Sequence, residues 1–201
     1  MDTGFSRLRT ESLVRLVADT SDGARSWALD LVEKNVRAYY GSEWRPRKKA
    51  RELAMDGMQL VVALVDQHRA GFVSFRMETE PTMRDDGSED IVLYCYELQV
   101  DEQYRGRGIG QQLMGVLERT ARSIAESAQT SVSTLPPCNM IMLTSFKANE
   151  GAVRFYKDKL GFEEDERSPD KVLPPKRAAK YNYVILSKKL ELGSVSSQLS
   201  S

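Results

Sequence analysis

The chain has 201 residues, of which 41% are hydrophobic, so it is long enough to bury the core of one ordinary domain. Lys and Arg together number 29, as do Asp and Glu, and the net charge of zero gives no overall attraction to nucleic acid or membrane. The sequence has only two cysteines and one histidine, which argues against a disulfide framework, a metal site and a histidine triad. It has no apolar run of the roughly 18–20 residues needed to span a membrane. We therefore expect a soluble intracellular protein.

The first half of the chain predicts two helices and three strands. Residues 1–23 are polar, and we interpret them as a loosely structured N-terminal extension. Apolar residues at helical spacing then predict a helix over 24–41, and a basic stretch with Pro46 in its first turn predicts a second helix. The strands are expected at 58–65, 71–78 and 91–100, with an acidic loop before the third.

The second half alternates helices and strands. The predicted elements, in order, are a helix from Gly108 toward Ala128, a loop at 127–138, a strand at 140–145, a helix at 149–160, a short strand at Phe162, a polar loop at 165–179 and a strand at 181–190. Hairpins followed by strand–helix–strand–helix predict an α/β fold, with a mixed sheet between helices. One domain would cover 24–192, and 193–201 is expected to be a disordered tail.

The most informative stretch runs from Val92 to Gly110. An apolar strand carries a single carboxylate, Glu97, and a basic glycine-rich loop over 105–110 then opens an amphipathic helix. Glycines allow close approach of a ligand, and the first N–H groups of a helix favour an anion. The loop lacks the Gly-Lys-Ser/Thr of a P-loop, and it does not match the dinucleotide fingerprint. A turn that binds nothing is the alternative, but the neighbouring carboxylate favours acyl transfer from coenzyme A.

Together with Asn149, Tyr156 and the Leu-Gly-Phe sequence at 160–162, this stretch resembles the GNAT superfamily of N-acetyltransferases over roughly residues 25–190. The resemblance implies a central mixed twisted sheet with helices on both faces and a bulged, splayed strand at the acetyl-CoA site. It implies acetyl-CoA as cosubstrate and no metal. The residues it implies for acetyl-CoA binding are Leu98, Val100, Arg105, Gly106, Arg107, Gly108, Ile109, Gly110, Asn149 and Tyr156.

A narrower set of motifs resembles the N-alpha-acetyltransferase D family. These motifs are Tyr40 with Ser42-Glu43-Trp44, Phe75-Arg76-x-Glu78, Leu93-Tyr94-Cys95-Tyr96-Glu97, Leu143-Thr144-x-Phe146-Lys147 and Tyr183-x-Ile185-Leu186-Ser187. That family acetylates the N-terminal serine of histone tails that begin Ser-Gly-Arg-Gly. The resemblance therefore implies a histone-tail partner, a nuclear and cytoplasmic location, and no nucleic-acid or membrane partner. We expect a monomer.

The chemistry requires a base for the amine and a proton for the thiolate. A peptide α-amine has a pKa near 8, so a modest base suffices, and Glu97 is the candidate, with Tyr96 beside it. In a regular strand Glu97 would face away from Tyr94 and Tyr96, so the site requires a bulge near 96–100. The resemblance suggests Tyr156 as general acid, but an aromatic ring that only packs under the cofactor is equally compatible with the sequence.

Specificity for a basic tail should come from acidic groups. Glu78 and Glu80 share one strand face, and residues 76–102 hold nine acidic side chains against two basic ones. The resemblance adds further candidates that contact the peptide, namely Tyr40, Trp44, Tyr94, Tyr96, Glu97, Thr144 and Tyr183. The tyrosines could instead be core residues, and either Tyr39 or Tyr40 could face the site.

Two other readings of the sequence concern the basic run and the activity. The run over 45–51 fits a solvated helix face better than a nuclear-import signal or a DNA contact. The activity could also be acetylation of lysine side chains or small amines, or the chain could be a non-catalytic acetyl-CoA-binding scaffold.

Overall fold

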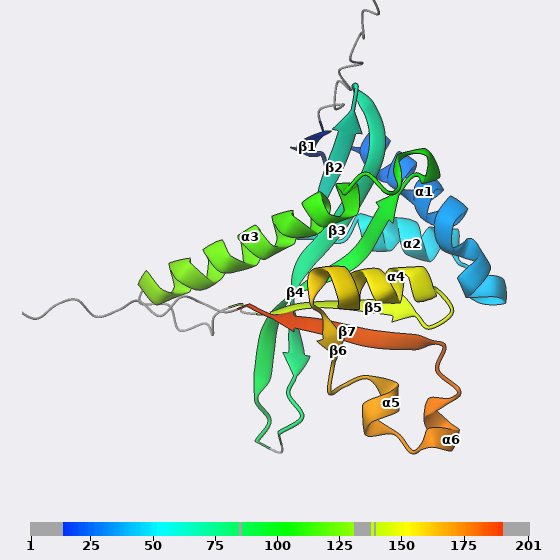
Figure 1. The fold of residues 1–201 in the computed structure, drawn as a ribbon. Helices are drawn as coiled ribbons and strands as arrows, with labels where there is room; N and C mark the ends of the chain where they lie inside the picture. Colours follow the sequence, from blue (N-terminus) through cyan, green and yellow to red (C-terminus); the bar gives the residue numbers. More distant parts are fainter. Residues whose placement is uncertain (1–13, 85, 131–137, 139, 191–201) are drawn as a thin grey trace, which may run out of the picture.

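A computed structural model describes residues 14–84, 86–130, 138 and 140–190 (Figure 1). The strands are β1 (Val14–Ala18), β2 (Gln59–Val65), β3 (His68–Pro81), β4 (Glu89–Val100), β5 (Met140–Phe146), β6 (Glu163–Glu164) and β7 (Tyr183–Lys189). The main helices are α1 (Asp22–Tyr40), α2 (Pro46–Leu53), α3 (Ile109–Thr130) and α4 (Glu150–Arg154), which continues into a π-helical turn, η3 (Phe155–Lys159). None of the helices within the described ranges is long and apolar enough to cross a membrane.

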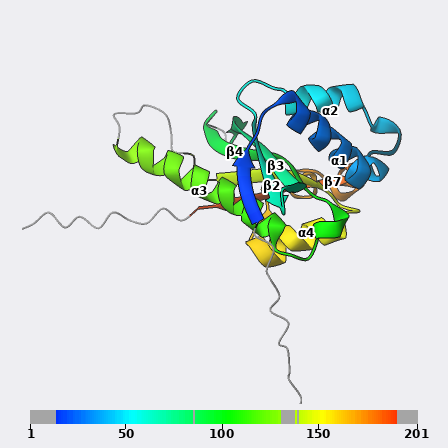
Figure 2. The same cartoon turned by 90° about the horizontal axis from the view of Figure 1, so that it is seen from above.

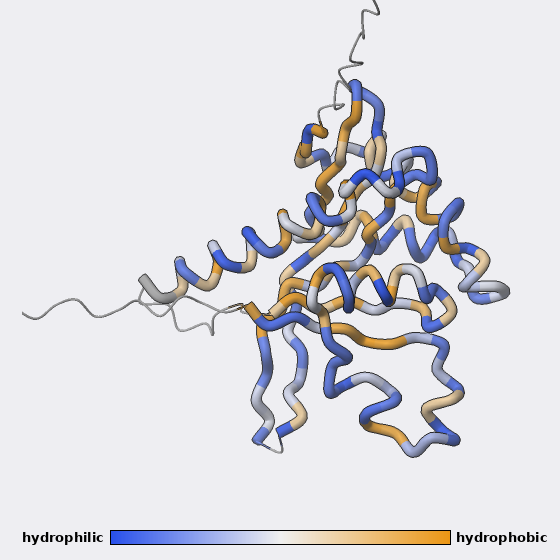
Figure 3. Tube along the Cα trace, in the orientation of Figure 1, coloured by the Kyte–Doolittle hydropathy of each residue, from blue (hydrophilic) through white to orange (hydrophobic). Residues whose placement is uncertain are grey.

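The seven strands form one mixed sheet in the order β1-β2-β3-β4-β5-β7-β6. β4 and β5 are parallel, and the other neighbours are antiparallel. Viewed from above, α1 and α2 cover one face while α3 and α4 cover the other (Figure 2). The apolar residues follow the strands and the inward sides of the helices (Figure 3). The expected α/β fold, with a mixed sheet between helices, is confirmed.

The N-terminal segment is more ordered than its composition suggests. Residues 14–18 form β1, which pairs with β2 from Val14–Val65 to Ala18–Val61. The prediction of a loosely structured segment over 1–23 is therefore wrong for β1, because backbone pairing along a sheet edge orders even a short strand. Ser21 then caps α1 by accepting a hydrogen bond from the Ala24 amide at 3.2 Å. Residues 1–13 and the predicted tail at 193–201 lie outside the described residues.

Strand β4 carries the bulge that the site requires. Ser74 of β3 pairs with Glu97, whereas the next residue, Phe75, pairs with Cys95, so Tyr96 is the extra residue. Cys95 and Leu98 both join the core under α3. Glu97 therefore points to the opposite face, toward α2, which a regular strand would not allow. The prediction of a bulge near 96–100 is confirmed, with the extra residue at the start of that range.

Beyond the bulge, β4 and β5 separate. Their parallel pairing runs from Val92–Met140 to Cys95–Leu143. Past that point, cavities lined by residues of both strands lie between them. This is the splay that the family resemblance implied, and it places the end of β4 beside the start of α4.

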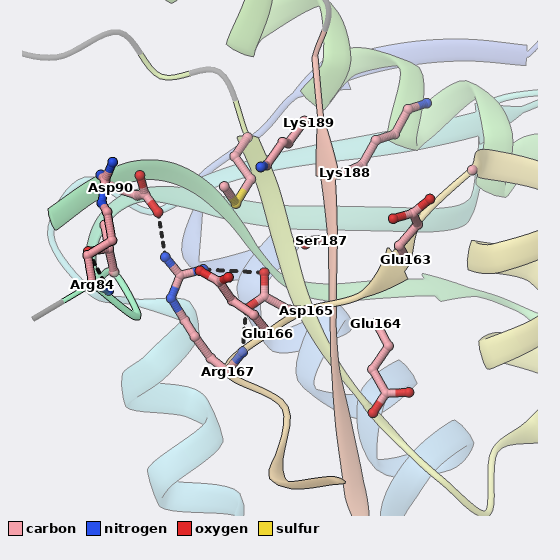
Figure 4. Close-up of a pocket in the computed structure, with 13 residues that line it drawn as sticks. Arg84, Asp90, Glu163, Glu164, Asp165, Glu166, Arg167, Ser187, Lys188 and Lys189 are labelled. Atoms are coloured by element: carbon pink, nitrogen blue, oxygen red, sulfur yellow. Dashed lines mark hydrogen bonds and ion pairs between the residues drawn. The ribbon is translucent and has the colours of Figure 1, made fainter. Parts of the chain in front are cut away.

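The segment at 165–179 is not the plain loop that its polarity predicted. It contains two short helices, α5 (Pro169–Val172) and α6 (Pro175–Ala178). At its start the Arg167 guanidinium pairs with Asp90 and Asp165, and its Nε donates to the Pro81 carbonyl at 2.7 Å. Figure 4 shows this network beside a cavity of about 710 Å³. Arg167 therefore ties the segment to the β3–β4 hairpin.

Candidate active site

A cavity of about 530 Å³ lies where the end of β4, the start of α3 and the helix α4 meet. It is lined by most of the residues predicted to bind acetyl-CoA, namely Leu98, Val100, Arg105, Gly106, Gly108, Ile109, Gly110, Asn149 and Tyr156. Arg107 does not line it, because its guanidinium lies over the Tyr104 ring at 5.4 Å. The cavity is large enough for an extended ligand, and backbone N–H groups of the α3 N-terminus border it.

Glycine is required at the positions of this loop for different structural reasons. Gly106 and Gly108 have φ of 75°, a region that favours glycine, and they turn the chain into α3. Gly110 has no such angle, but a Cβ there would lie 3.1 Å from the Phe155 ring. Gly110 therefore lets α3 approach the η3 turn, which brings two walls of the cavity together.

Asn35 of α1 fixes the end of β4 and the loop arginine. Its Nδ2 donates to Gln99 Oε1 at 3.0 Å and to the Val100 carbonyl at 3.2 Å. Its Oδ1 accepts from Arg105 Nη2 at 2.8 Å. The Arg105 charge is thereby held at the rim of the cavity, where it suits a phosphate group.

A smaller cavity of about 110 Å³ contains the candidate base, Glu97. It shares Asn149 and Tyr156 with the larger cavity and Tyr40 and Thr144 with a third one. It therefore lies between the other two, and a group placed there could react with ligands from either side.

Glu97 is 8% exposed and has a partner on each carboxylate oxygen. Its Oε1 lies 2.7 Å from Lys49 Nζ, and its Oε2 accepts from Gln99 Nε2 at 2.8 Å. Lys49 also pairs with Glu52. Burial disfavours the Lys49 ammonium, but the charges of Glu97 and Glu52 outweigh burial and raise the pKa of Lys49.

Tyr156 lies in the η3 turn and borders both the larger and the smaller cavity. Asn149 begins the helix before it by accepting a hydrogen bond from the Ala152 amide at 3.3 Å. Burial, with a smaller contribution from Cys95 and Glu97, raises the pKa of Tyr156 well above its usual value. The phenol therefore keeps its proton at neutral pH. Cys95 is fully buried in the core, as its expected packing role requires.

The third cavity, about 380 Å³, opens on the α2 side of the sheet. Its tyrosines come from three elements: Tyr40 from α1, Tyr94 and Tyr96 from β4, and Tyr183 from β7. Tyr94 shares a 2.6 Å hydrogen bond with Thr144. These five predicted substrate residues are thus brought together. Tyr40 faces this side and Tyr39 faces the larger cavity, which answers the question that the sequence left open.

Three other predicted substrate residues do not line the cavities. Trp44 is buried in the core under α1, with its ring 5.4 Å from that of Tyr40. Glu78 lies behind the wall, where it accepts from the Tyr96 hydroxyl at 2.5 Å and from Arg76 Nε at 2.6 Å. Both hydrogen bonds lower the pKa of Glu78, that from Arg76 more strongly. Glu80 is half-buried, and burial raises its pKa.

Sequence reasoning missed several residues of the site. Lys49, Glu43 and Glu52 line the third cavity. The prediction of a solvated helix face at 45–51 is correct for most of the run but wrong for Lys49, which is buried. A signal was present, because Lys49 stands four residues before Leu53 and thus on the apolar face of α2. Similarly, Asn35 interrupts the apolar face of α1.

The structure thus combines a mixed sheet, a bulged central strand that separates from its parallel neighbour, and a buried carboxylate between two cavities. The model of the acetyltransferase (GNAT) family matches residues 28–162, and the chain belongs to this family. It is therefore a GNAT acetyltransferase, and GNAT proteins bind acetyl-CoA.

Solved structures with the same fold include two proteins of Arabidopsis thaliana and one N-acetyltransferase of Escherichia coli. Arabidopsis thaliana NAA60 with a bisubstrate analogue is 16% identical, with a TM-score of 0.59 over 89% of this chain and 100% of that one. Arabidopsis thaliana Naa50 with the bisubstrate analogue CoA-Ac-MVNAL is 21% identical, with a TM-score of 0.55 over 88% and 99%. The ribosomal-protein-S18-alanine N-acetyltransferase of Escherichia coli is 12% identical, with a TM-score of 0.60 over 92% and 98%.

Proposed function

We propose that this protein is an N-alpha-acetyltransferase that transfers acetyl from acetyl-CoA to the N-terminal serine of histone tails beginning Ser-Gly-Arg-Gly. The observation that carries the proposal is the position of Glu97 in the small cavity. That cavity lies between the cavity of about 530 Å³ beside the 105–110 loop, called the loop-side cavity below, and the third cavity, which is walled by tyrosines. Such tails occur on newly made histones and on chromatin, so the proposal includes a cytoplasmic and nuclear location. It also includes a monomer that acts on a free tail.

The loop-side cavity is suited to acetyl-CoA, which supplies the thioester. Arg105 and the α3 N-terminus would hold its phosphates, and the end of β4 at Leu98 and Val100 would pair with its extended arm. Glu97 would accept the amine proton, directly or through a water, and Tyr156 would hold a proton at Oη for the sulfur. The acetyl carbon then exchanges its bond to sulfur for a bond to nitrogen. The amine gives one proton to Glu97 and the sulfur takes one from Tyr156, so coenzyme A leaves as a thiol and the number of protons is conserved.

The third cavity supports a small, unblocked N-terminus followed by a basic residue. Its aromatic walls leave about 380 Å³, which favours small leading residues such as Ser-Gly over bulky ones. Glu43 and Glu52 line it, and Glu78 lies behind Tyr96. Carboxylates at the wall would attract an arginine at the third position. The solved structures of N-terminal acetyltransferases with this fold are compatible with such a substrate.

The test is acetylation of three peptides by the purified protein, followed by mass spectrometry. The peptides are Ser-Gly-Arg-Gly-Lys-Gly with a free N-terminus, the same peptide with a blocked N-terminus, and a free Ser-Gly-Ala-Gly-Lys-Gly. We expect one acetyl group at the N-terminus of the first peptide, none on the second, and a KM about tenfold higher for the third, because its arginine is missing.

Two outcomes would contradict the proposal. Equal acetylation of the blocked peptide would assign the activity to lysine side chains. Binding of acetyl-CoA without acetylation of any amine would identify a scaffold. A Glu43→Ala variant separates the arginine contribution further, since Glu43 lines the third cavity and its loss should raise the KM of the first peptide and leave that of the third unchanged.

A further inference from the structure

We propose that Asn35 and Gln99 are positioning residues for the candidate base. Together they connect Arg105, in the loop beside the acetyl-CoA cavity, to the carboxyl group of Glu97. The arginine that would hold the phosphates of acetyl-CoA thereby also sets the direction of the group that receives the amine proton. The inference rests on the proposed function, because it takes Glu97 as the base, and it assigns a task to two amide side chains that the proposed function leaves without one.

The first observation is an unbroken chain of side-chain hydrogen bonds between the two sites. Arg105 Nη2 donates to Asn35 Oδ1 at 2.8 Å, and Asn35 Nδ2 donates to Gln99 Oε1 at 3.0 Å. Gln99 Nε2 then donates to Glu97 Oε2 at 2.8 Å. All three distances are normal for hydrogen bonds. The chain therefore joins the rim of the loop-side cavity to the small cavity that contains the base.

The second observation is that the arginine end sets the direction of every bond in the chain. A guanidinium has only donors, so Asn35 must turn its carbonyl oxygen toward Arg105 and its NH₂ group toward Gln99. Gln99 must then offer its carbonyl oxygen to Asn35, which leaves its own NH₂ group for Glu97. The second N–H of Asn35 is also used, because it donates to the Val100 carbonyl at 3.2 Å. The arginine therefore determines which group of Gln99 meets the base.

The third observation is that the end of the chain near the base is buried. Gln99 is 7% exposed, and Glu97, two residues earlier on the same strand face, is 8% exposed. In the sheet register Gln99 pairs with Phe72, a core residue under α1, so its side chain points toward the helix that carries Asn35. Water competes little with hydrogen bonds in such surroundings, and each bond of a buried chain strengthens the next.

The carboxyl group of Glu97 has one further anchor. Lys49 Nζ lies 2.7 Å from Oε1, the oxygen that Gln99 does not contact. Tyr96 lines the same small cavity, but its hydroxyl donates to Glu78. Two anchors from different elements, α2 and β4, therefore hold the plane of the carboxyl group, and the anchor on β4 continues to the loop.

The end of β4 belongs to the same unit. Arg105 Nε donates to the Val100 carbonyl at 3.1 Å, and Asn35 donates to that same oxygen. A phosphate that fixes the guanidinium would therefore also restrict the strand end and the two amides, and with them the carboxyl group. Binding of acetyl-CoA would in this way prepare the base before the amine arrives.

The experiment measures how fast the side-chain NH₂ protons of Gln99 exchange with water, by NMR of ¹⁵N-labelled protein. The signal is assigned by its loss in Gln99→Met. We expect exchange about tenfold faster in Asn35→Ala, which removes the partner of Gln99, and about threefold faster in Arg105→Met, which opens the chain one residue further away. Arg105 is exposed, so Arg105→Met serves even if Asn35→Ala does not fold.

Lys34→Met is the matched control. Lys34 precedes Asn35 on α1, and its Nζ pairs with Asp101, directly after β4, at 2.9 Å. The substitution therefore removes a contact between the same two parts of the fold but lies outside the chain. Because an exposed ion pair contributes little, the Gln99 exchange rate, kcat and the Kd of acetyl-CoA should all stay within about twofold of wild type.

The kinetics of peptide acetylation separate the two ends of the chain. Gln99→Met should lower kcat about tenfold and leave the Kd of acetyl-CoA within about twofold, because Arg105 and Asn35 keep their contact. Asn35→Ala should lower kcat to a similar extent and also raise that Kd about fivefold, because Arg105 loses an anchor. The double variant should have the kcat of Gln99→Met alone, since Asn35 reaches the base only through Gln99.

The outcomes separate this inference from the proposed function. Unchanged exchange of the Gln99 protons in Arg105→Met would overturn the inference even if the histone peptide is acetylated. A double variant whose kcat falls by the product of the two single losses, about a hundredfold, would overturn it as well. Faster exchange in Arg105→Met and Asn35→Ala, without acetylation of any histone peptide, would support the inference and contradict the proposed substrate.

Discussion

The two side chains proposed to handle protons are prepared for opposite tasks. Glu97 is surrounded by donors, with Lys49 Nζ at one carboxylate oxygen and Gln99 Nε2 at the other. Tyr156 is a buried phenol whose surroundings favour its neutral form. The carboxylate is thus placed as an acceptor of hydrogen bonds, while the phenol keeps a proton that it can donate. The assignment of roles therefore rests on the environment of each group.

Substitution of Tyr156 by Phe distinguishes a general acid from a packing residue. We expect kcat to fall by about 10²-fold, because the leaving sulfur loses its proton source. The ring is retained, so the Kd of acetyl-CoA and the Tm should change little. Steady-state kinetics, calorimetric titration and thermal denaturation measure the three quantities. Tyr181→Phe is the matched control, since Tyr181 is exposed. An unchanged kcat in Tyr156→Phe would assign the ring to packing alone.

At the scale of elements, β4 determines the chemistry through one extra residue. The need for a bulge could be predicted from sequence, because Tyr94 and Glu97 are on opposite faces of a regular strand. The position of the extra residue could not, because it depends on how β4 pairs with β3. The burial of Lys49 was missed for a similar reason. A basic helix is ordinarily solvated, and only the fold brings it against a carboxylate of a distant strand.

Gly71 tests how closely β3 and β4 must approach beside the site. A Cβ at Gly71 would lie 2.7 Å from the Gln99 carbonyl oxygen and 3.2 Å from the Val100 Cα. Both atoms belong to the backbone, so they cannot move aside as a side chain could. Gly71→Ala should therefore lower the free energy of unfolding by about 1–3 kcal/mol and weaken acetyl-CoA binding, since 99 and 100 line its cavity.

The measurements are urea denaturation and calorimetric titration. Gly23→Ala is the control, because a Cβ at Gly23 meets nothing within 4 Å and lies in the first turn of α1. It should leave the free energy of unfolding within about 0.5 kcal/mol of wild type. A Gly71→Ala protein as stable as wild type would show that β3 and β4 can separate without cost.

At the scale of the whole molecule, the segment at 165–179 is held to the sheet by charge rather than by an apolar core. Arg167 connects Asp165 with Asp90 of β4. Its side chain is 10% exposed and that of Asp165 only 4%. The sequence placed these residues in polar loops, and nothing in their local pattern predicts a buried pair. Such long-range partners follow from topology, which local patterns do not contain.

Arg167→Ala should be strongly destabilising, by about 3 kcal/mol, because it leaves the buried Asp165 without its partner. Urea denaturation measures this change. The control is Arg84→Ala, which removes an exposed arginine from the same hairpin and should cost at most about 0.5 kcal/mol. A loss below about 1 kcal/mol in Arg167→Ala would mean that water takes the place of the guanidinium at Asp165.

The separation of β4 from β5 has a mechanical consequence. The sheet consists of two plates, β1–β4 and β5–β7, joined by four residue pairs from Val92–Met140 to Cys95–Leu143. Glu97 belongs to the first plate, whereas Tyr156 follows directly from the second. A change in the angle between the plates would therefore alter the distance between base and acid. A ligand that contacts both plates would fix that angle, and with it the distance between Glu97 and Tyr156 during acetyl transfer.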